Sequence, residues 1–299
     1  MNENCRTESG SKRICSFCRF RKCIRIGVNV NFVLARHQPQ SFRVEAGLYD
    51  QVVSNFNFAF IHRSIAQKLI ADSLSTEPTL WDDFNLTVVE WPITRYYLEK
   101  TNVLEMLEPH EINPFIDNLL PFWFFVYCTF YTLQNDGHNQ NRLHMIDEKG
   151  LPVIPDASRR FLECAPFAGL QNVDVVSAKI HDVHVAWMNG VYNFHRNHME
   201  THEFAIICHI LTLRLAIEMF PRKREPREQL NRLFYAVKQT FNGMYANAEV
   251  RMGNLVFLIN DVVNVVKEMR EWETIFRLNM MTSDEAESSV DYFKQVVNF

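Results

Sequence analysis

The sequence has few glycines and no long apolar run, and each shortage excludes a class of protein. No run of 18 consecutive apolar residues occurs among its 299 residues, so we expect no membrane-spanning helix. No apolar segment follows the charged first residues, which argues against a secretion signal. The nine glycines form no phosphate-binding loop and no Gly-x-Ser-x-Gly motif. We therefore expect a protein that is not an enzyme and does not enter a membrane.

The composition favours one large domain with a short appendage. Hydrophobic residues make up 47% of the chain, which is enough to bury a core of about 250 residues. The net charge of −4 and a pI near 6.3 argue against a protein that binds nucleic acid along its whole surface. Any contact with nucleic acid is therefore expected to be local.

The seven cysteines fall into two groups. Cys128, Cys164 and Cys208 stand alone in apolar surroundings, so we expect buried thiols. The other four lie within the first 23 residues. In a chain without a secretion signal, such a cluster is more often reduced or metal-bound than paired in disulfides. The cluster consists of Cys5, Cys15, Cys18 and Cys23.

The cluster lies in a basic segment, residues 1–28, which contrasts with the acidic remainder. A tetrahedral zinc site needs four ligands, and the Cys15-x2-Cys18 pair with Cys5 ten residues earlier supplies three. An isolated C-x2-C pair can also arise by chance or serve redox chemistry, but the surrounding basic residues favour zinc. These basic residues are Arg6, Lys12, Arg13, Arg19, Arg21, Lys22 and Arg25.

Helical periodicity dominates the chain from residue 47, after an aperiodic stretch at 29–46 that is typical of a hinge. Apolar residues recur at steps of three and four between Leu48 and Leu69, which predicts an amphipathic helix. The Phe115–Leu133 stretch is rich enough in apolar residues to predict a buried helix. Short apolar runs around Gly150 predict a β-hairpin within 143–154. Further helices are predicted at 80–98, 109–134, 174–198, 201–220, 226–248, 251–281 and 286–298.

Residues 15–28 (Cys-Ser-Phe-Cys-Arg-Phe-Arg-Lys-Cys-Ile-Arg-Ile-Gly-Val) closely resemble the end of the DNA-binding domain of nuclear hormone receptors. The resemblance implies that Cys5, Cys15 and Cys18 are the second, third and fourth zinc ligands of the second finger, and that Cys23 packs inside the domain. It also implies that Arg19, Arg21 and Lys22 contact DNA phosphates. Phosphate contacts position a protein on DNA but do not read its sequence.

The family pattern places the first ligand of this finger six residues before Cys5, which is upstream of Met1. The first finger, with the helix that reads bases in the major groove, is also missing from the chain. If the protein starts at Met1, we expect three cysteines to hold zinc weakly and sequence-specific DNA binding to be lost. The other explanation is a gene model that omits upstream coding sequence, and both explanations stay open.

The rest of the chain resembles the ligand-binding domain of the same family, in the style of divergent nematode receptors. Residues 88–91 (Val-Val-Glu-Trp), Leu107, Glu111 and 115–116 are similar to its third-to-fifth helix signature. Residues 201–207 are similar to the start of its eighth helix, where an acidic residue anchors the scaffold. Residues 251–269 are similar to the long helices that form dimers. On this resemblance, Val262 and Val266 are expected at a dimer interface.

The segment from Tyr292 to Val297 resembles the activation helix of the family, with one departure. The family has a glutamate where this chain has Gln295, and Ile93 stands where the opposing clamp lysine is expected. A carboxylate forms stronger, charge-assisted bonds to the exposed N–H groups of a coactivator helix than an amide does. Both halves of the clamp are therefore altered. The simpler interpretation is a terminal amphipathic helix that covers the core. The groove residues so implied are Ile93, Tyr292, Phe293, Gln295, Val296 and Val297.

Two patterns suggest enzyme chemistry and have simpler explanations. Histidines at 181, 184, 195, 198 and 202 have helical spacing that can hold a metal, but no H-E-x-x-H motif accompanies them. Asp82 and Asp83 resemble half of a prenyl-transfer motif, but the third aspartate is absent. We interpret this pair as a helix cap and a partner for the helix dipole.

Together these features predict an all-α, layered ligand-binding domain at 47–299, with a small β-hairpin, after a partial zinc-finger module at 1–28 and a hinge at 29–46. The expected function is transcription regulation in the nucleus, with zinc, DNA, a receptor homo- or heterodimer and a coactivator or corepressor as partners. The 24 phenylalanines either line a cavity for a lipophilic ligand or fill it. One alternative is a receptor-like partner that dimerises with full-length receptors and titrates them without binding DNA. Another is a helical enzyme with an accessory zinc knuckle.

Overall fold

The computed structural model describes residues 43–71, 77–146, 149–164 and 170–280. Within these residues the chain is mostly helical, with one small antiparallel sheet. The long helices are α3 (Arg43–Ala71), α4 (Leu80–Lys100), α5 (Pro109–Gln134), α8 (Val173–Arg196), α9 (Thr201–Met219), α10 (Glu225–Met244) and α11 (Ala248–Met280). The short elements are η2 (Leu104–Met106), α6 (Gly137–Gln140), β1 (Arg142–His144), β2 (Gly150–Pro152) and α7 (Pro155–Leu162).

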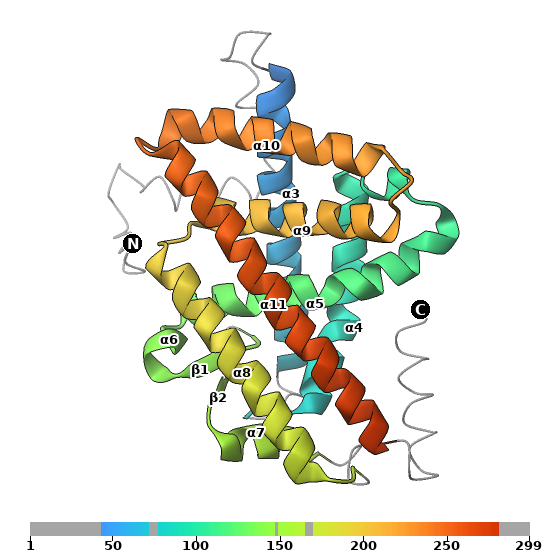
Figure 1. Cartoon of the computed structure of the whole chain (residues 1–299), viewed down its shortest axis with the longest axis vertical. Helices are drawn as coiled ribbons and strands as arrows, with labels where there is room; N and C mark the ends of the chain where they lie inside the picture. Colours follow the sequence, from blue (N-terminus) through green and yellow to red (C-terminus); the bar gives the residue numbers. More distant parts are fainter. Residues whose placement is uncertain (1–42, 72–76, 147–148, 165–169, 281–299) are drawn as a thin grey trace, which may run out of the picture.

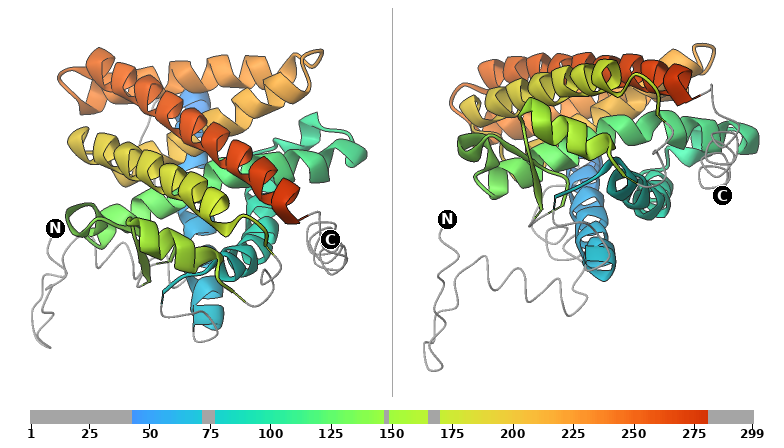
Figure 2. Two further views of the ribbon diagram at one scale, coloured as in Figure 1. Left: turned by 60° about the horizontal axis from the view of Figure 1, so that its bottom comes forward. Right: turned by 90° about the horizontal axis from the view of Figure 1, so that it is seen from below.

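The helices are arranged in layers, as the sequence predicts for an all-α layered domain. α3 and α4 pack side by side in one outer layer, and α8 and α11 pack together in the opposite one (Figures 1 and 2). Between them lie α5 and α9, while α10 packs against α3, α9 and α11. The β1–β2 hairpin and α7 lie beside α8 at one end of the domain (Figure 1).

α5 and α9 lie at the centre of the domain because side chains on all of their faces are buried. All residues from Phe122 to Thr132 in α5 are buried, as are those from Glu203 to Leu213 in α9. A helix that is hydrophobic around its whole circumference must be covered by protein or lipid. Among the described residues, no helix is both long and apolar enough to cross a bilayer. Here the covering is provided by the outer layers.

The start of α4 places Asp82 and Asp83 in the first turn of a helix, as expected, but the N-cap is Thr79 and not one of the two aspartates. Thr79 is the N-cap, and its hydroxyl accepts a hydrogen bond from the N–H of Asp82 at 3.3 Å. The Asp82 carboxylate in turn accepts from the N–H of Thr79 at 2.8 Å, which completes a capping box. Asp83 lies in the same first turn, but burial, together with the nearby carboxylates of Glu90 and Asp82, raises its pKa to about 7, so it is only partly ionised at neutral pH.

Most of the predicted elements are confirmed with small shifts of their ends. The predicted helix at 109–134 coincides with α5, and the predicted hairpin forms with Leu143 opposite Leu151. The helix predicted at 226–248 ends earlier, at Met244, and α11 begins at Ala248. The sequence did not predict η2, α6 or α7. The terminal helix predicted at 286–298 lies outside the described residues.

A tight turn between α5 and β1 requires a glycine. Asp136 and Asn141, at the two ends of α6, have φ angles of 57° and 52° in the left-handed region. A Cβ atom on Gly137 would lie 2.4 Å from the carbonyl oxygen of Arg142 and 2.8 Å from the His144 ring. A backbone oxygen cannot move aside as a side-chain tip can. Only glycine therefore fits at position 137 in this turn.

Candidate functional site

Most residues of the predicted zinc and activation-helix sites lie outside the described part of the chain. This applies to Cys5, Cys15, Cys18, Arg19, Arg21 and Lys22, and also to Tyr292, Phe293, Gln295, Val296 and Val297. In the described ranges, no group of three or more His, Cys, Asp or Glu residues is placed to hold a metal ion. The cysteine cluster lies outside these ranges, so both sites remain predictions.

The structure does place Ile93, the position matched to a clamp lysine. It lies on α4, half-buried, with its side chain packed against the core. The helix continues through the neighbouring Pro92 without ending. Pro92 has no N–H to donate to the carbonyl four residues earlier, so one helical hydrogen bond is lost there. Ile93 thus offers an apolar surface where the family motif has a positive charge.

Residues matched to the third-to-fifth helix signature join separate helices. The indole N–H of Trp91 in α4 donates to Asp117 of α5 at 3.1 Å. Glu111, in the first turn of α5, accepts from Lys223 Nζ at 2.5 Å, and this bond holds the pKa of Glu111 below its usual value. Lys223 precedes α10. The matched residues therefore fix how α4, α5 and α10 are joined.

The structure does not place Val262 and Val266 on an exposed face, where a dimer interface would need them. Both side chains are buried in the domain core, with exposed fractions of 0% and 1%. α11 packs against α8, α5 and α10, and these contacts bury the side of the helix that carries the two valines. The exposed apolar residues of α11 are Val250, Val256, Phe257 and Leu278.

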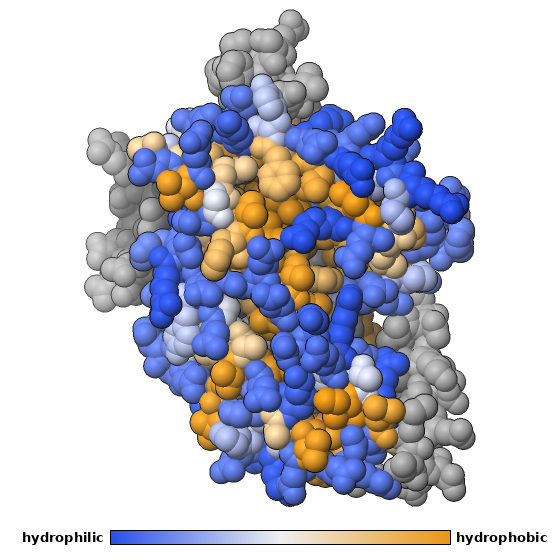
Figure 3. Space-filling model, in the orientation of Figure 1, coloured by the Kyte–Doolittle hydropathy of each residue, from blue (hydrophilic) through white to orange (hydrophobic). Residues whose placement is uncertain are grey.

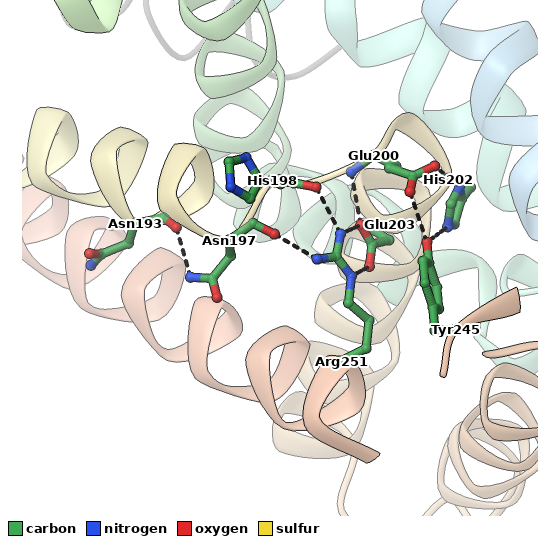
Figure 4. A network of polar contacts seen from close by, with 8 residues as sticks. All are labelled: Asn193, Asn197, His198, Glu200, His202, Glu203, Tyr245 and Arg251. Carbon is green, nitrogen blue, oxygen red and sulfur yellow. Dashed lines mark hydrogen bonds and ion pairs between the residues drawn. The ribbon is translucent and has the colours of Figure 1, made fainter. Parts of the chain in front are cut away.

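The acidic residue expected to anchor the scaffold is Glu203, and it forms an ion pair with Arg251 (Figure 4). The Glu203 side chain is fully buried in the first turn of α9, and Arg251 reaches it from the first turns of α11. Two parallel N–H donors of the guanidinium contact its two carboxylate oxygens. This bidentate geometry is the strongest kind of protein ion pair.

Arg251 also caps the end of a third helix. Its remaining N–H groups donate to the carbonyl oxygens of Asn197 at 2.6 Å and His198 at 2.8 Å, directly after α8 (Figure 4). A left-handed φ of 47° at His198 ends the helix there. Helix-terminal carbonyls have no partner within their own helix, so an arginine satisfies both their hydrogen bonds and the negative end of the dipole. One side chain thus joins α8, α9 and α11.

Three neighbours extend this network toward α10. The Tyr245 hydroxyl donates to Glu200 at 3.2 Å and lies 3.0 Å from His202 Nε2. Burial, together with the nearby carboxylates of Glu203 and Glu200, raises the pKa of Tyr245 to about 12. The hydroxyl therefore stays protonated at neutral pH and remains a donor.

A second buried ion pair joins the other outer layer to the core. Arg63 of α3 contacts Glu90 of α4, and the two side chains are 0% and 3% exposed. The guanidinium lies 3.7 Å from the centroid of the Tyr127 ring in α5, which adds a cation–π contact. Burial lowers the pKa of Arg63, but Glu90 together with Tyr131, Cys128 and Tyr127 more than offsets this effect and keeps the pKa above its usual value. Arg63 is therefore a permanent positive charge inside the domain.

This pair leaves several donors unused. Among the described residues, Nε and Nη1 of Arg63, Nε2 of Gln67 and the hydroxyl of Tyr127 are buried without a hydrogen-bond partner. Gln67 lies one turn after Arg63, on the same face of α3. Buried N–H and O–H groups are normally satisfied, because each unmade bond costs about 1–3 kcal/mol. We call these residues, with Glu90, the buried polar centre. Its chemistry suits a small group with oxygen acceptors.

Sequence reasoning missed the buried polar centre, although a signal was present. The apolar stripe of α3 runs through Val52, Phe56 and Ala59, all fully buried. Steps of four residues extend that stripe to Arg63 and Gln67. A charge on the buried face of a helix predicts a partner, because an unpaired charge is too costly to bury.

The histidines serve as packing and hydrogen-bonding groups. Ser158 of α7 is fully buried, and its Oγ lies 3.0 Å from His184 Nδ1 and 3.2 Å from His181 Nδ1, both in α8. A hydroxyl has one proton to donate, so one of the two imidazoles must donate to it in turn. Burial lowers the pKa of His184 to about 3. We interpret this cluster as the joint between α7 and α8, because a buried hydroxyl is not open to a substrate.

The three described cysteines carry no disulfide. Cys128 and Cys208 are fully buried, as expected, and burial holds their pKa values well above the usual range. Cys164 is only half-buried. These thiols are therefore poor nucleophiles.

Comparison with known proteins does not assign a family. No protein-family model matches the chain, and no curated protein matches its sequence. The resemblance to nuclear receptors rests on the motifs described above.

Proposed function

We propose that this chain is a transcription regulator of the nuclear receptor type, whose layered helical domain responds to a partner or ligand. The observation that carries this proposal is the Glu203–Arg251 ion pair. Two segments, 48 residues apart, each resembled a receptor helix on separate grounds, and their matched residues meet in one bidentate contact. The layered order of helices and the hairpin after α5 support the same proposal.

The proposed activity is the binding of coregulator helices beside α4. Ile93 is half-buried at the surface of α4, and Gln295 is the position where the receptor family carries a glutamate. A neutral clamp binds a helix terminus more weakly than a charged one. The protein would then act with low intrinsic affinity for coactivators, as a weak activator or a repressor.

Restoring the clamp tests this activity. We expect Gln295→Glu to raise the affinity for an amphipathic coactivator peptide several-fold, since a charge-assisted bond adds roughly 1 kcal/mol. Adding Ile93→Lys should raise it further. Fluorescence anisotropy measures peptide binding, and a reporter driven by residues 47–299 fused to an unrelated DNA-binding domain measures transcription. Gln134→Glu, an exposed change at the end of α5, is the control. If neither clamp variant binds better, the terminal segment is not an activation helix.

The second candidate function, titration of related receptors by dimerisation, is favoured by a surface on α10 and α11. Figure 3 shows apolar residues gathered over the region where these helices meet. The exposed fractions are 50% for Tyr235, 64% for Val250, 46% for Val256 and 61% for Phe257. Phe257→Asp should weaken dimerisation, whereas Leu278→Asp, an equally exposed change farther along α11, should not. Equal effects of the two changes in sedimentation velocity would argue against this surface.

Different residues are proposed to bind the ligand, the metal and DNA. A lipophilic molecule with an oxygen acceptor suits the unused donors of Arg63, Gln67 and Tyr127. Native mass spectrometry of the purified protein, compared with Gln67→Leu, tests for such a molecule. Zinc is proposed at Cys5, Cys15 and Cys18, and DNA phosphates at Arg19, Arg21 and Lys22. The proposed compartment is the nucleus.

A further inference from the structure

The outward face of α3 and α4 carries a continuous apolar surface remote from the α10–α11 surface. Three residues of α3 on it are exposed by 42% (Phe58), 38% (Ile61) and 55% (Ile65). On α4, Val88 and Tyr96 are exposed by 44% and 38%. We call the set of Phe58, Ile61, His62, Ile65, Val88, Pro92 and Tyr96 the α3–α4 surface.

The register of the two helices places these residues in matching rows. α3 and α4 run antiparallel, because Arg63 pairs with Glu90 and Asn55 donates to the carbonyl of Lys100. The same register brings Phe58 against Tyr96, with ring centroids 5.4 Å apart. It sets Ile61 opposite Pro92 and Ile65 opposite Val88. Since neighbouring helices lie about 8–10 Å apart, the rows form one patch rather than scattered residues.

The size of this patch matches one side of a protein interface. With side-chain areas of roughly 150–200 Å², the exposed fractions amount to about 400 Å² of apolar surface. A standard interface buries about 800 Å² on each partner, a little over half of it apolar. The patch therefore supplies the apolar share of one standard interface.

The charges around the patch favour a second copy of this chain over a charged partner. A two-fold interface sets a surface against itself, so charged residues on it would meet like charges. The α3–α4 surface holds no acidic or basic residue apart from His62, whose ring lies tilted against the Phe58 ring with the centroids 4.2 Å apart. At its edge, Arg95 is already paired with Glu99 at 3.3 Å, and Lys100 lies over the Tyr96 ring at 5.2 Å. Lys68, three residues after Ile65, is a further exposed charge at the edge. The apolar rows themselves present no charge that would repel a second copy or attract an opposite charge.

We propose that the α3–α4 surface binds the same surface of a second copy of this chain. This contact is separate from the α10–α11 surface, so a chain that uses both can assemble beyond a dimer. Two different self-complementary interfaces on one subunit are what a closed tetramer needs.

The test measures the mass of the full-length protein by sedimentation velocity over a concentration series. Phe257→Asp is introduced first, so that any association left does not use the α10–α11 surface. This variant should remain dimeric. Adding Ile65→Asp and Val88→Asp should weaken the remaining dimer at least about tenfold, because each change buries a charge in an apolar contact. The matched control adds Val175→Asp, a 60%-exposed valine of α8 outside the surface, and should stay dimeric.

A monomeric Phe257→Asp variant at all concentrations overturns the proposal, and so does a dimer that survives Ile65→Asp with Val88→Asp. A photo-crosslinking residue at Ile61 identifies the occupant directly. A covalent pair of copies is expected, with none from the same residue at Val175. Crosslinks within one chain to residues 1–42, or only to another protein, would instead assign the surface to that occupant. Thermal melts show whether each variant is folded, and the reporter assay reads the proposed function separately.

Discussion

The two buried ion pairs of this domain differ in how completely they are satisfied. Glu203 is fully buried, but its partner Arg251 is 16% exposed and donates to two further carbonyl oxygens at a helix end. Arg63 and Glu90 are both buried, and two guanidinium nitrogens remain without a hydrogen bond among the described residues. The Glu203–Arg251 pair joins its helices with every guanidinium nitrogen in a hydrogen bond. The second has bonding capacity left over, which a structural role does not require.

We expect the largest loss of stability when the buried polar centre is broken. Glu90→Ala leaves the Arg63 charge buried without a counter-ion, so we expect the free energy of unfolding to fall by about 3–5 kcal/mol. Glu99→Ala removes one partner of an exposed pair and should cost under about 1 kcal/mol. Urea denaturation followed by circular dichroism measures both. Similar losses in the two variants would show that Arg63 reaches water.

Breaking the Glu203–Arg251 pair should lower the free energy of unfolding by less. Arg251→Ala strands the buried Glu203 carboxylate, but solvent reaches this site through the space that the partly exposed arginine leaves. We expect a loss of about 2–3 kcal/mol. Arg251→Lys should recover only part of it, because an ammonium cannot make the bidentate contact and cap both carbonyls. If Arg251→Lys recovered the full stability, the positive charge alone, and not the bidentate geometry, would hold these helices together.

At acid pH we expect a further loss of stability, from buried histidines that belong to neither ion pair. Burial lowers the pKa of His184 and of His209 to about 3. Their unfolded values lie near 6.5, so the unfolded chain binds more protons below that pH. Stability is therefore fully present above pH 6.5 and is lost as the pH falls toward 3, by up to about 1.4 kcal/mol per pH unit for each histidine. His209→Gln should flatten this slope between pH 6.5 and 5, and an unchanged slope would place its origin elsewhere.

We expect the smallest change in stability when both partners of an ion pair are replaced together, and this change should differ between the two pairs. Replacing both partners of the buried polar centre, Arg63→Met with Glu90→Leu, should change stability by less than about 1 kcal/mol, because apolar packing often replaces a buried pair without loss. The same exchange at Arg251 and Glu203 also releases the carbonyls of Asn197 and His198, and should cost roughly 1–2 kcal/mol. A large loss in the first double variant would show that the centre is more than a packing device.

The sequence predicted the long helices well because periodicity reports which face of a helix is apolar. It did not predict α7, a helix of only eight residues that follows the hairpin directly. It also could not show that Val262 and Val266 are buried within the domain, since the period of α11 does not tell whether its apolar stripe meets a neighbouring helix or a second molecule. That distinction depends on the crossing of α8, α10 and α11, which is decided by contacts far apart in the sequence.

For the candidate site, the sequence predicted single residues better than their partners. Glu203 was expected as an anchor, and Arg251 was named only as part of a dimer segment. Arg63 was not singled out, although its place on a buried stripe signals a buried charge. A pairing between residues 27 positions apart depends on how α3 turns back into α4. Local patterns do not contain this information.

The turn at Gly137 has a consequence for tracing the ancestry of this chain. Any other residue there would collide with the backbone that starts β1, so selection should retain the glycine after the surrounding surface residues have diverged. Among the described glycines, Gly137 is the one at which an added Cβ would meet a backbone atom. In a sequence that matches no family model, such a position gives a fixed point from which remote homologues can be aligned.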